Sequence, residues 1–157
     1  MRDRAEGSTR RGFLVGVLGL AGLGLTACDL LGDDTVEPEP PPQGLVSLLA
    51  ATGVLADSYD TTIAAVPTLS DRLTPIRDAH RAHVQALAQA LRAPSPKPGA
   101  SRGVVPPDPP LALAALLASE KAAREDAFTE CLDAPARYAP LVGSIAAARA
   151  SHVEVLS

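Results

Sequence analysis

Tryptophan is absent from this chain of 157 residues, and only two tyrosines and two phenylalanines are present. Long runs of β-branched residues, which are typical of strands, are also missing. Alanine and leucine dominate the sequence instead, and both are strong helix formers. The composition therefore predicts an all-helical fold, and no strand pattern competes with it.

Signature motifs of several enzyme classes are missing as well. The chain lacks the phosphate loop G-x-x-x-x-G-K-[ST], the nucleophile elbow G-x-S-x-G, the pair C-x-x-C and the zinc motif H-E-x-x-H. We therefore expect a protein that is not an enzyme.

Only two cysteines are present, Cys28 and Cys131. Cys28 ends the stretch Leu25-Thr26-Ala27-Cys28, which resembles a bacterial lipobox, where a signal peptidase cuts and the thiol takes a diacylglycerol. If Cys28 is lipidated, Cys131 has no partner, and a disulfide within the chain is excluded. We interpret Cys131 as a buried small apolar residue at a helix end, the alternative being a reactive or metal-binding thiol.

Residues 1–27 have the pattern of an export signal. The start is basic, and Arg10 and Arg11 form a twin-arginine pair ahead of the apolar segment 13–25. This segment would span only about 20 Å as a helix, too little for a hydrocarbon core of about 30 Å. Residues 1–27 therefore resemble a removable lipoprotein signal of the twin-arginine (Tat) pathway. We expect the mature protein to be attached to the extracytoplasmic face of the cell membrane by the lipid on Cys28.

The chain that follows this signal is acidic. Four of the 14 basic and two of the 18 acidic residues lie in residues 1–27, which leaves a net charge of −6 on residues 28–157. This charge argues against a nucleic-acid partner and gives no attraction to anionic lipid. The partner class that remains is another protein of the cell envelope, and the oligomeric state stays open.

Proline-rich segments divide the mature chain. Residues 28–44 are acidic and proline-rich, which predicts an extended tether. Residues 93–110 form a long proline-rich loop, which we interpret as a crossing or surface connection. Elsewhere apolar residues recur at spacings of three and four, the period of an amphipathic helix. The expected helices span residues 45–66, 70–92 (or from 74, because of Pro75), 111–132 and 138–156 (or from 140).

Four helices of this length predict an antiparallel four-helix bundle over residues 45–157. Ala127, Phe128 and Cys131 are expected on the inward stripe of the third helix, and Leu141 on that of the fourth.

Polar residues interrupt these apolar stripes at similar depths. His80 and His83 share one face of the second helix, because residues three apart lie side by side. A rotated second helix, with Val84 inward, would instead bring one of them to solvent. Glu120 faces inward in the third helix and His152 in the fourth. The predicted polar layer at mid-height consists of Tyr59, His80, His83, Glu120, Arg124 and His152.

Buried charges must be paired, hydrogen-bonded or metal-bound, because an isolated one costs on the order of several kcal/mol. One interpretation of the layer is a network in which Glu120 binds Arg124 or a histidine, with Tyr59 closing it. The other is a metal site in which His80, His83, Glu120 and His152 bind zinc, copper or iron. We favour the network, so no cofactor is expected.

Short alanine-rich motifs also relate the chain to a known family. They are Leu48-Leu49-Ala50-Ala51 in the first helix, Ala79-His80-Arg81-Ala82-His83 in the second and Leu117-Ala118-Ser119-Glu120 in the third. On these motifs, residues 45–156 resemble the ferritin-like domain of Tat-exported lipoproteins of high-GC Gram-positive bacteria. The resemblance implies a ferritin-like four-helix bundle and brings no settled activity.

The chain departs from the di-iron members of the ferritin-like fold. Those proteins need a glutamate on each of two helices and Glu-x-x-His on each of the other two. Here Thr52 stands where the first helix would offer a glutamate, and Arg77 and Arg149 stand three residues before His80 and His152. The resemblance therefore implies a bundle with a degenerate metal site, and we do not expect a di-iron centre.

Two functional hypotheses of different classes follow. The first is a non-catalytic, lipid-anchored structural or interaction protein at the extracytoplasmic membrane face. The alternative is a mononuclear transition-metal-binding or redox protein that uses the core histidines and Glu120. A third hypothesis, a small-molecule binder with a gap between alanine-rich helices, is neither supported nor excluded by the sequence.

Overall fold

The computed structural model of the chain describes residues 39–99 and 103–157. The predicted export signal, including Arg10 and Arg11, lies outside the described residues. The predicted lipidation site Cys28 and the tether up to residue 38 lie outside them too. Within the described ranges, no helix is long and apolar enough to cross a membrane.

Four α-helices account for most of the described chain, and no strand occurs in that part. The all-helical fold expected from the composition is therefore confirmed, and each expected helix begins and ends within about two residues of the observed one. The helices are α1 (Gln43–Ala65), α2 (Ser70–Leu91), α3 (Pro109–Asp133) and α4 (Ala139–Leu156), and a 3₁₀ turn, η1 (Pro67–Leu69), leads into α2.

Prolines and a capping aspartate set the helix ends. Pro67 directly follows the C-cap of α1, where it stops the helix because its ring and missing N–H do not fit a helix interior. Asp108 caps α3 by accepting a hydrogen bond from the Leu111 backbone N–H at 3.0 Å. Of the two starts considered for the second helix, the earlier one is observed, and Pro75 lies inside α2 with its ring exposed.

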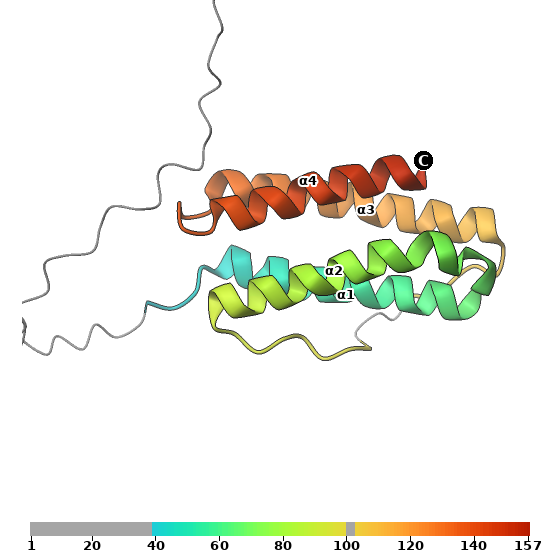
Figure 1. Ribbon diagram of the computed structural model, residues 1–157, viewed down its shortest axis with the longest axis horizontal. Coiled ribbons are helices and arrows are strands. Elements are labelled where there is room, and N and C mark those ends of the chain that lie inside the picture. Colours follow the sequence, from blue (N-terminus) through green and yellow to red (C-terminus); the bar gives the residue numbers. More distant parts are fainter. Residues whose placement is uncertain (1–38, 100–102) are drawn as a thin grey trace, which may run out of the picture. The chain divides into compact units, whose positions relative to one another are not determined.

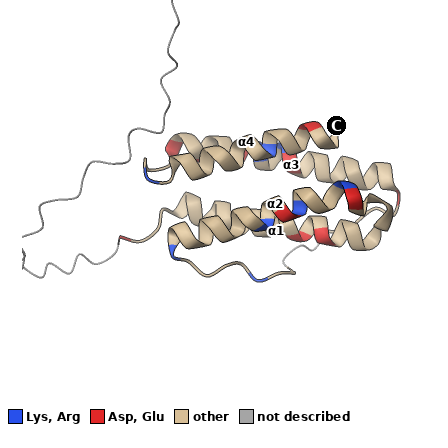
Figure 2. Cartoon of the chain, in the orientation of Figure 1, with Lys and Arg blue, Asp and Glu red and all other residues tan. Residues whose placement is uncertain are grey.

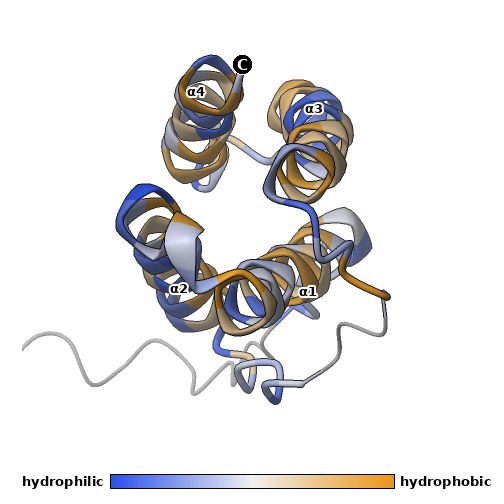
Figure 3. Ribbon diagram, turned by 90° about the vertical axis from the view of Figure 1, so that its right-hand side faces the viewer, coloured by the Kyte–Doolittle hydropathy of each residue, from blue (hydrophilic) through white to orange (hydrophobic). Residues whose placement is uncertain are grey.

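The helices form two antiparallel hairpins, α1 with α2 and α3 with α4 (Figure 1). The loop between α2 and α3 runs back along the bundle, so α3 begins at the end where α2 also begins (Figure 1). As a result α2 and α3 run in the same direction, and so do α1 and α4. These two parallel pairs lie diagonally across the bundle (Figure 3), whereas every helix runs antiparallel to the two helices that it packs against, as the sequence predicted.

The crossing loop has the composition that such a connection needs. An extended proline-rich chain covers about 3.1 Å per residue, so about 17 residues are enough to pass a helix of about 33 Å. The loop is attached midway along α1, where the Gly99 backbone N–H donates to Asp57 Oδ2 at 2.7 Å. Gly99 has a φ of 94°, a left-handed conformation that favours glycine.

The interior between the four helices, seen end-on in Figure 3, contains two apolar clusters with polar residues between them. One cluster contains Leu45, Leu48, Leu49, Leu87, Ala88, Leu91, Ala127, Val142 and Ile145, and the other contains Leu55, Tyr59, Leu73, Ile76, Leu116 and Leu156. The buried polar residues are Thr52, Thr62, His80, Glu120, Arg149 and His152.

One inward assignment on the third helix is wrong. Phe128 is 57% exposed, whereas Ala127, which was also expected to face inward, is fully buried. The inward stripe passes from Glu120 to Ala127, about two helical turns, so position 128 is turned about 100° away from it. Leu141 and the free Cys131 are half-buried and pack against the core as expected, and Val142 of α4 is fully buried beside them.

Candidate functional site

The carboxylate of Glu120 is the meeting point of the polar layer. Its Oε1 atom accepts a hydrogen bond from Tyr59 Oη at 2.8 Å and lies 2.5 Å from His80 Nε2. His152 Nδ1 lies 3.4 Å from the same oxygen. Each of the four helices thus contributes one of these side chains, α1 Tyr59, α2 His80, α3 Glu120 and α4 His152.

These side chains are shielded from water. Tyr59, His80 and Glu120 are fully buried, and His152 is 9% exposed. The ring of His80 contacts both aromatic neighbours, at centroid distances of 5.3 Å from Tyr59 and 4.9 Å from His152. We refer to Tyr59, His80, Glu120 and His152 as the Glu120 cluster.

Glu120 carries the negative charge of the cluster. Burial raises the pKa of Glu120, but the nearby His152 and the hydrogen bonds with His80 and Tyr59 lower it further than burial raises it, to about 2. Burial lowers the pKa of His80, although its hydrogen bond to Glu120 acts in the opposite direction. Burial, together with the nearby carboxylate, raises the pKa of Tyr59. Glu120 is therefore ionised while Tyr59 keeps its proton.

Arg149 brings a positive charge into the same interior, and the sequence analysis missed it. It is fully buried, and its Nη2 donates to Thr52 Oγ1 at 2.7 Å while Nη1 donates to the Ala123 carbonyl at 2.6 Å. Burial lowers its pKa, and the charges of Glu120 and Asp126 partly offset that effect. One signal was available, because a residue three positions before the inward His152 shares its helix face.

Arg124, which was expected to pair with Glu120, does not belong to the layer. Its side chain lies at the surface, where its guanidinium binds its neighbour Glu125. A long arginine side chain on the flank of a helix keeps its charge in water when it can. Arg149 supplies the interior cation in its place.

His83 is the other predicted residue that the structure separates from the cluster. It is half-buried, and its ring lies 6.3 Å from that of His80. Burial and the neighbouring His80, His152 and Arg149 lower its pKa to about 4. Of the two orientations considered for the second helix, the observed one buries His80 fully and leaves His83 at the edge of the core.

Three of the predicted ligands lie close enough to share one metal ion. His80, Glu120 and His152 each offer a ligand atom within 4.8 Å of the others. Glu120 Oε2, His80 Nδ1 and His152 Nδ1 are buried without a hydrogen-bond partner among the described residues. Such atoms cost about 1–3 kcal/mol each when they stay unsatisfied. Two imidazoles and a carboxylate with free lone pairs fit zinc, copper or iron(II).

The positive charge of Arg149 disfavours the binding of a second metal ion beside this site. The positions at which di-iron proteins place further carboxylates are Thr52, Arg77 and Arg149. Thr52 and Arg149 are hydrogen-bonded to each other, and Arg77 pairs with Asp60 and Asp78 near the surface. A permanent guanidinium repels a nearby cation, so the donor set suits a single ion.

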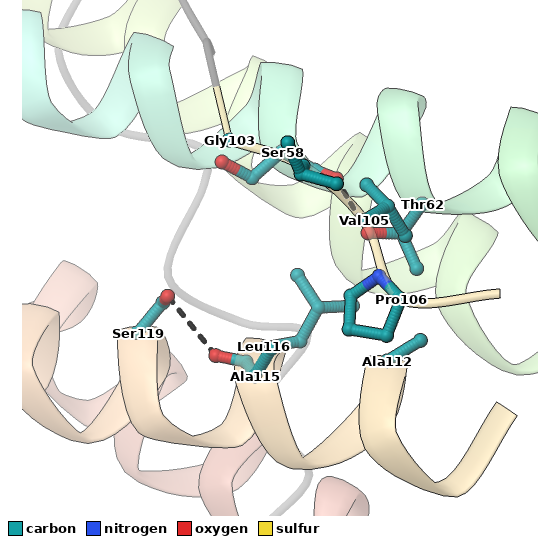
Figure 4. Close-up of a pocket in the computed structure, with 10 residues that line it drawn as sticks. Ser58, Thr62, Gly103, Val105, Pro106, Ala112, Ala115, Leu116 and Ser119 are labelled. Atoms are coloured by element: carbon teal, nitrogen blue, oxygen red, sulfur yellow. Dashed lines mark hydrogen bonds between the residues drawn. The ribbon is translucent and has the colours of Figure 1, made fainter. Parts of the chain in front are cut away.

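A separate hollow of about 120 Å³ lies between α1, α3 and the crossing loop (Figure 4). Its lining includes the hydroxyl groups of Ser58, Thr62 and Ser119. Each of these hydroxyls donates to a backbone carbonyl one turn earlier in its own helix. Since these polar groups are already used, the hollow offers no convergent donors to a ligand.

Comparison of the chain with protein-family models, with curated proteins and with solved structures finds no match. A functional conclusion therefore depends on the chain's own residues, and the Glu120 cluster is the arrangement with the most specific chemistry.

Proposed function

We propose that the Glu120 cluster binds one transition-metal ion, zinc, copper or iron, inside a lipid-anchored bundle at the extracytoplasmic membrane face. The observation that carries this proposal is the convergence of His80, Glu120 and His152, with ligand atoms within 4.8 Å of one another. His80 lies in α2, Glu120 in α3 and His152 in α4, so an ion held by these residues would join three helices.

The connectivity of the bundle supports a ferritin-like architecture. A single long crossing connection between the second and third helices is typical of ferritin-like bundles, and α2 and α3 are joined in this way (Figure 1). Sites of that fold lie in the bundle core between inward-facing side chains. The Glu120 cluster has this location, with fewer carboxylates.

The burial of the cluster indicates a binding role rather than turnover of a substrate. Closed metal sites with protein ligands are structural, whereas catalytic sites keep an open position for water or substrate. A bound zinc ion would stabilise the packing of α2, α3 and α4, and copper or iron would add redox capacity. His80, Glu120 and His152 would hold the ion, while Tyr59 keeps the carboxylate oriented through its 2.8 Å hydrogen bond.

A second candidate function is a metal-free bundle that acts through protein interaction. The observation that favours it is the 2.5 Å distance between His80 Nε2 and Glu120 Oε1. Two ligands of a tetrahedral ion at about 2.0–2.2 Å are separated by about 3.4 Å. Metal binding through these two atoms therefore requires a movement of roughly 1 Å, whereas a hydrogen-bonded network requires none.

Metal analysis of the full-length chain purified from cells distinguishes the two candidates. The metal proposal expects about one ion per chain, lost in His80→Ala and in His152→Ala. His83→Ala is the matched control, because His83 lies in the same helix but outside the convergent set, and it should keep the ion. Protein without metal from metal-replete cells, or metal retained in both ligand variants, would overturn the proposal.

Thermal unfolding gives an independent measurement. At a ligand concentration about 100-fold above Kd, binding adds about 2.7 kcal/mol to the free energy of unfolding. For a domain of this size that corresponds to a rise in Tm of roughly 10 °C or more. No shift with zinc, copper or iron would favour the metal-free interaction protein.

A further inference from the structure

The outer seam between α3 and α4 is an apolar groove of about 510 Å³. Its α4 wall consists only of glycine and alanine, so little side-chain bulk covers the backbone there. Its α3 wall presents an aromatic ring and a thiol. These six lining residues are Gly143, Ala146, Ala147, Ala150, Phe128 and Cys131.

The outer face of α4 differs from that of an ordinary surface helix. A surface helix normally carries charged and polar residues on the side away from the core. The only charged residues of α4 are Arg149, which is buried, and Glu154. Figure 2 shows long uncharged stretches along α4. This face therefore has little to keep it solvated.

Phe128 projects beside this groove. Its side chain is 57% exposed, and Leu132, one turn later on the same side of α3, is 72% exposed. An exposed aromatic residue next to a hollow lined by small residues is typical of an interface anchor. The same surface thus carries the projecting ring of Phe128 and, along the glycine and alanines of α4, a hollow that such a ring could fill.

We propose that this groove binds the same groove of a second copy of the chain, in a two-fold symmetric dimer in which Phe128 of each copy enters the hollow along α4 of the other. A two-fold interface joins identical patches, so each patch must carry both a projection and its complement. Phe128 and the Gly143–Ala147 hollow meet that condition.

The charges at the edge of the groove are compatible with such a dimer. Arg124 and Glu125 line one end of it and are partly exposed. Because Arg124 and Glu125 are bound to each other within the chain, this edge carries no net charge, and a second copy meets no like-charge repulsion there. A lipid surface is a poorer occupant, because the groove offers no excess of basic residues. The proposal does not depend on metal binding in the core.

Sedimentation velocity of the full-length chain in detergent, from about 1 to 100 µM, tests the dimer. We expect a concentration-dependent dimer that Phe128→Asp weakens at least about 30-fold, because loss of a central aromatic anchor has effects of this size. Gly143→Leu fills the hollow from the other side and should weaken the dimer as well. A Cβ at Gly143 would lie 3.5 Å from Cys131 Sγ, an ordinary contact, so the backbone there has room for the first side-chain atom.

Leu111→Asp is the matched control. Leu111 is an exposed apolar residue of the same helix that does not line the groove. The dimer dissociation constant of the Leu111→Asp variant should therefore stay within about threefold of that of the unmodified chain. Circular dichroism identifies any variant that fails to fold, and in that event the remaining variant decides. A monomer throughout the concentration range, or a dimer that tolerates both Phe128→Asp and Gly143→Leu, overturns the proposal.

Discussion

The middle of the bundle and its two ends are stabilised in different ways. At the ends, leucine, isoleucine and valine side chains from several helices are removed from water, which contributes about 25 cal/mol per Å² of buried apolar surface. In the middle, Glu120 and Arg149 are both fully buried, and the cost of removing their charges from water offsets much of their mutual attraction.

This difference indicates that the middle is not optimised for stability. Apolar residues of similar volume often stabilise a core as well as, or better than, a buried charge pair does. Local departures from good packing and full hydrogen bonding tend to occur where a protein has a functional site. The unsatisfied atoms of Glu120, His80 and His152 are such departures.

The largest expected effect comes from removing one interior charge. Arg149→Met should lower the free energy of unfolding by about 3–5 kcal/mol, because it leaves Glu120 without the buried cation and Thr52 without its donor. The double variant Arg149→Met with Glu120→Gln should lose less than the sum of the two single losses. Urea unfolding of all three variants measures this, and strictly additive losses would show that the two charges do not interact.

The apolar ends should respond with somewhat smaller losses. Leu73→Ala and Leu87→Ala, one in each cluster, should each lower the free energy of unfolding by about 2–5 kcal/mol through lost burial and a residual cavity. Leu111→Ala, at an exposed position, is the control and should change it by less than about 0.5 kcal/mol. Equal losses at buried and exposed sites would contradict the assigned core.

Acid should lower the free energy of unfolding through the titratable groups in the middle of the bundle, because the apolar side chains at its ends do not titrate. The pKa of His83 is about 4 in the folded chain, below the ordinary 6.5 of histidine. The unfolded chain therefore takes up the proton first, and the free energy of unfolding falls as the pH decreases from about 6.5 to about 4. Below pH 4.5, Glu120 adds a further loss, because its folded-state pKa of about 2 means that the unfolded chain is protonated first.

A histidine variant isolates this effect. With a chelator present, His83→Gln should flatten the dependence of the free energy of unfolding on pH between about 4 and 6.5, by at most about 1.4 kcal/mol per pH unit. Leu73→Ala should shift the same curve downwards without changing its slope. An unchanged slope in His83→Gln would mean that His83 titrates alike in the folded and unfolded chain.

Periodicity was enough to find the helices and most of the layer. Tyr59, His80, Glu120 and His152 follow apolar residues at spacings of three and four, and a spacing of that kind determines a helix face without knowledge of the partner helices. The depths of His80 and Glu120 agreed because both lie near the middle of their helices, while Tyr59 and His152 lie nearer the C-terminal ends of α1 and α4. This would hold whether α2 and α3 ran in the same or in opposite directions.

What periodicity could not supply was the choice between two neighbouring positions. Phe128 and Ala127 are both apolar, and only the close packing of α3 against its neighbours selects the smaller one for the interior. The same limitation applies to Arg149, because a fully buried arginine becomes favourable only when a partner such as Thr52 is in reach.

Arg124 gives the smallest expected effect and the sharpest contrast with Arg149. Its guanidinium binds Glu125 at the surface, and exposed ion pairs contribute only about 0–1 kcal/mol. Arg124→Met should therefore lower the free energy of unfolding by less than about 0.5 kcal/mol, while the same substitution at Arg149 costs several times more. Urea unfolding at low and high salt measures both. A large loss at Arg124 would mean that its charge reaches Glu120 after all, as the sequence alone had suggested.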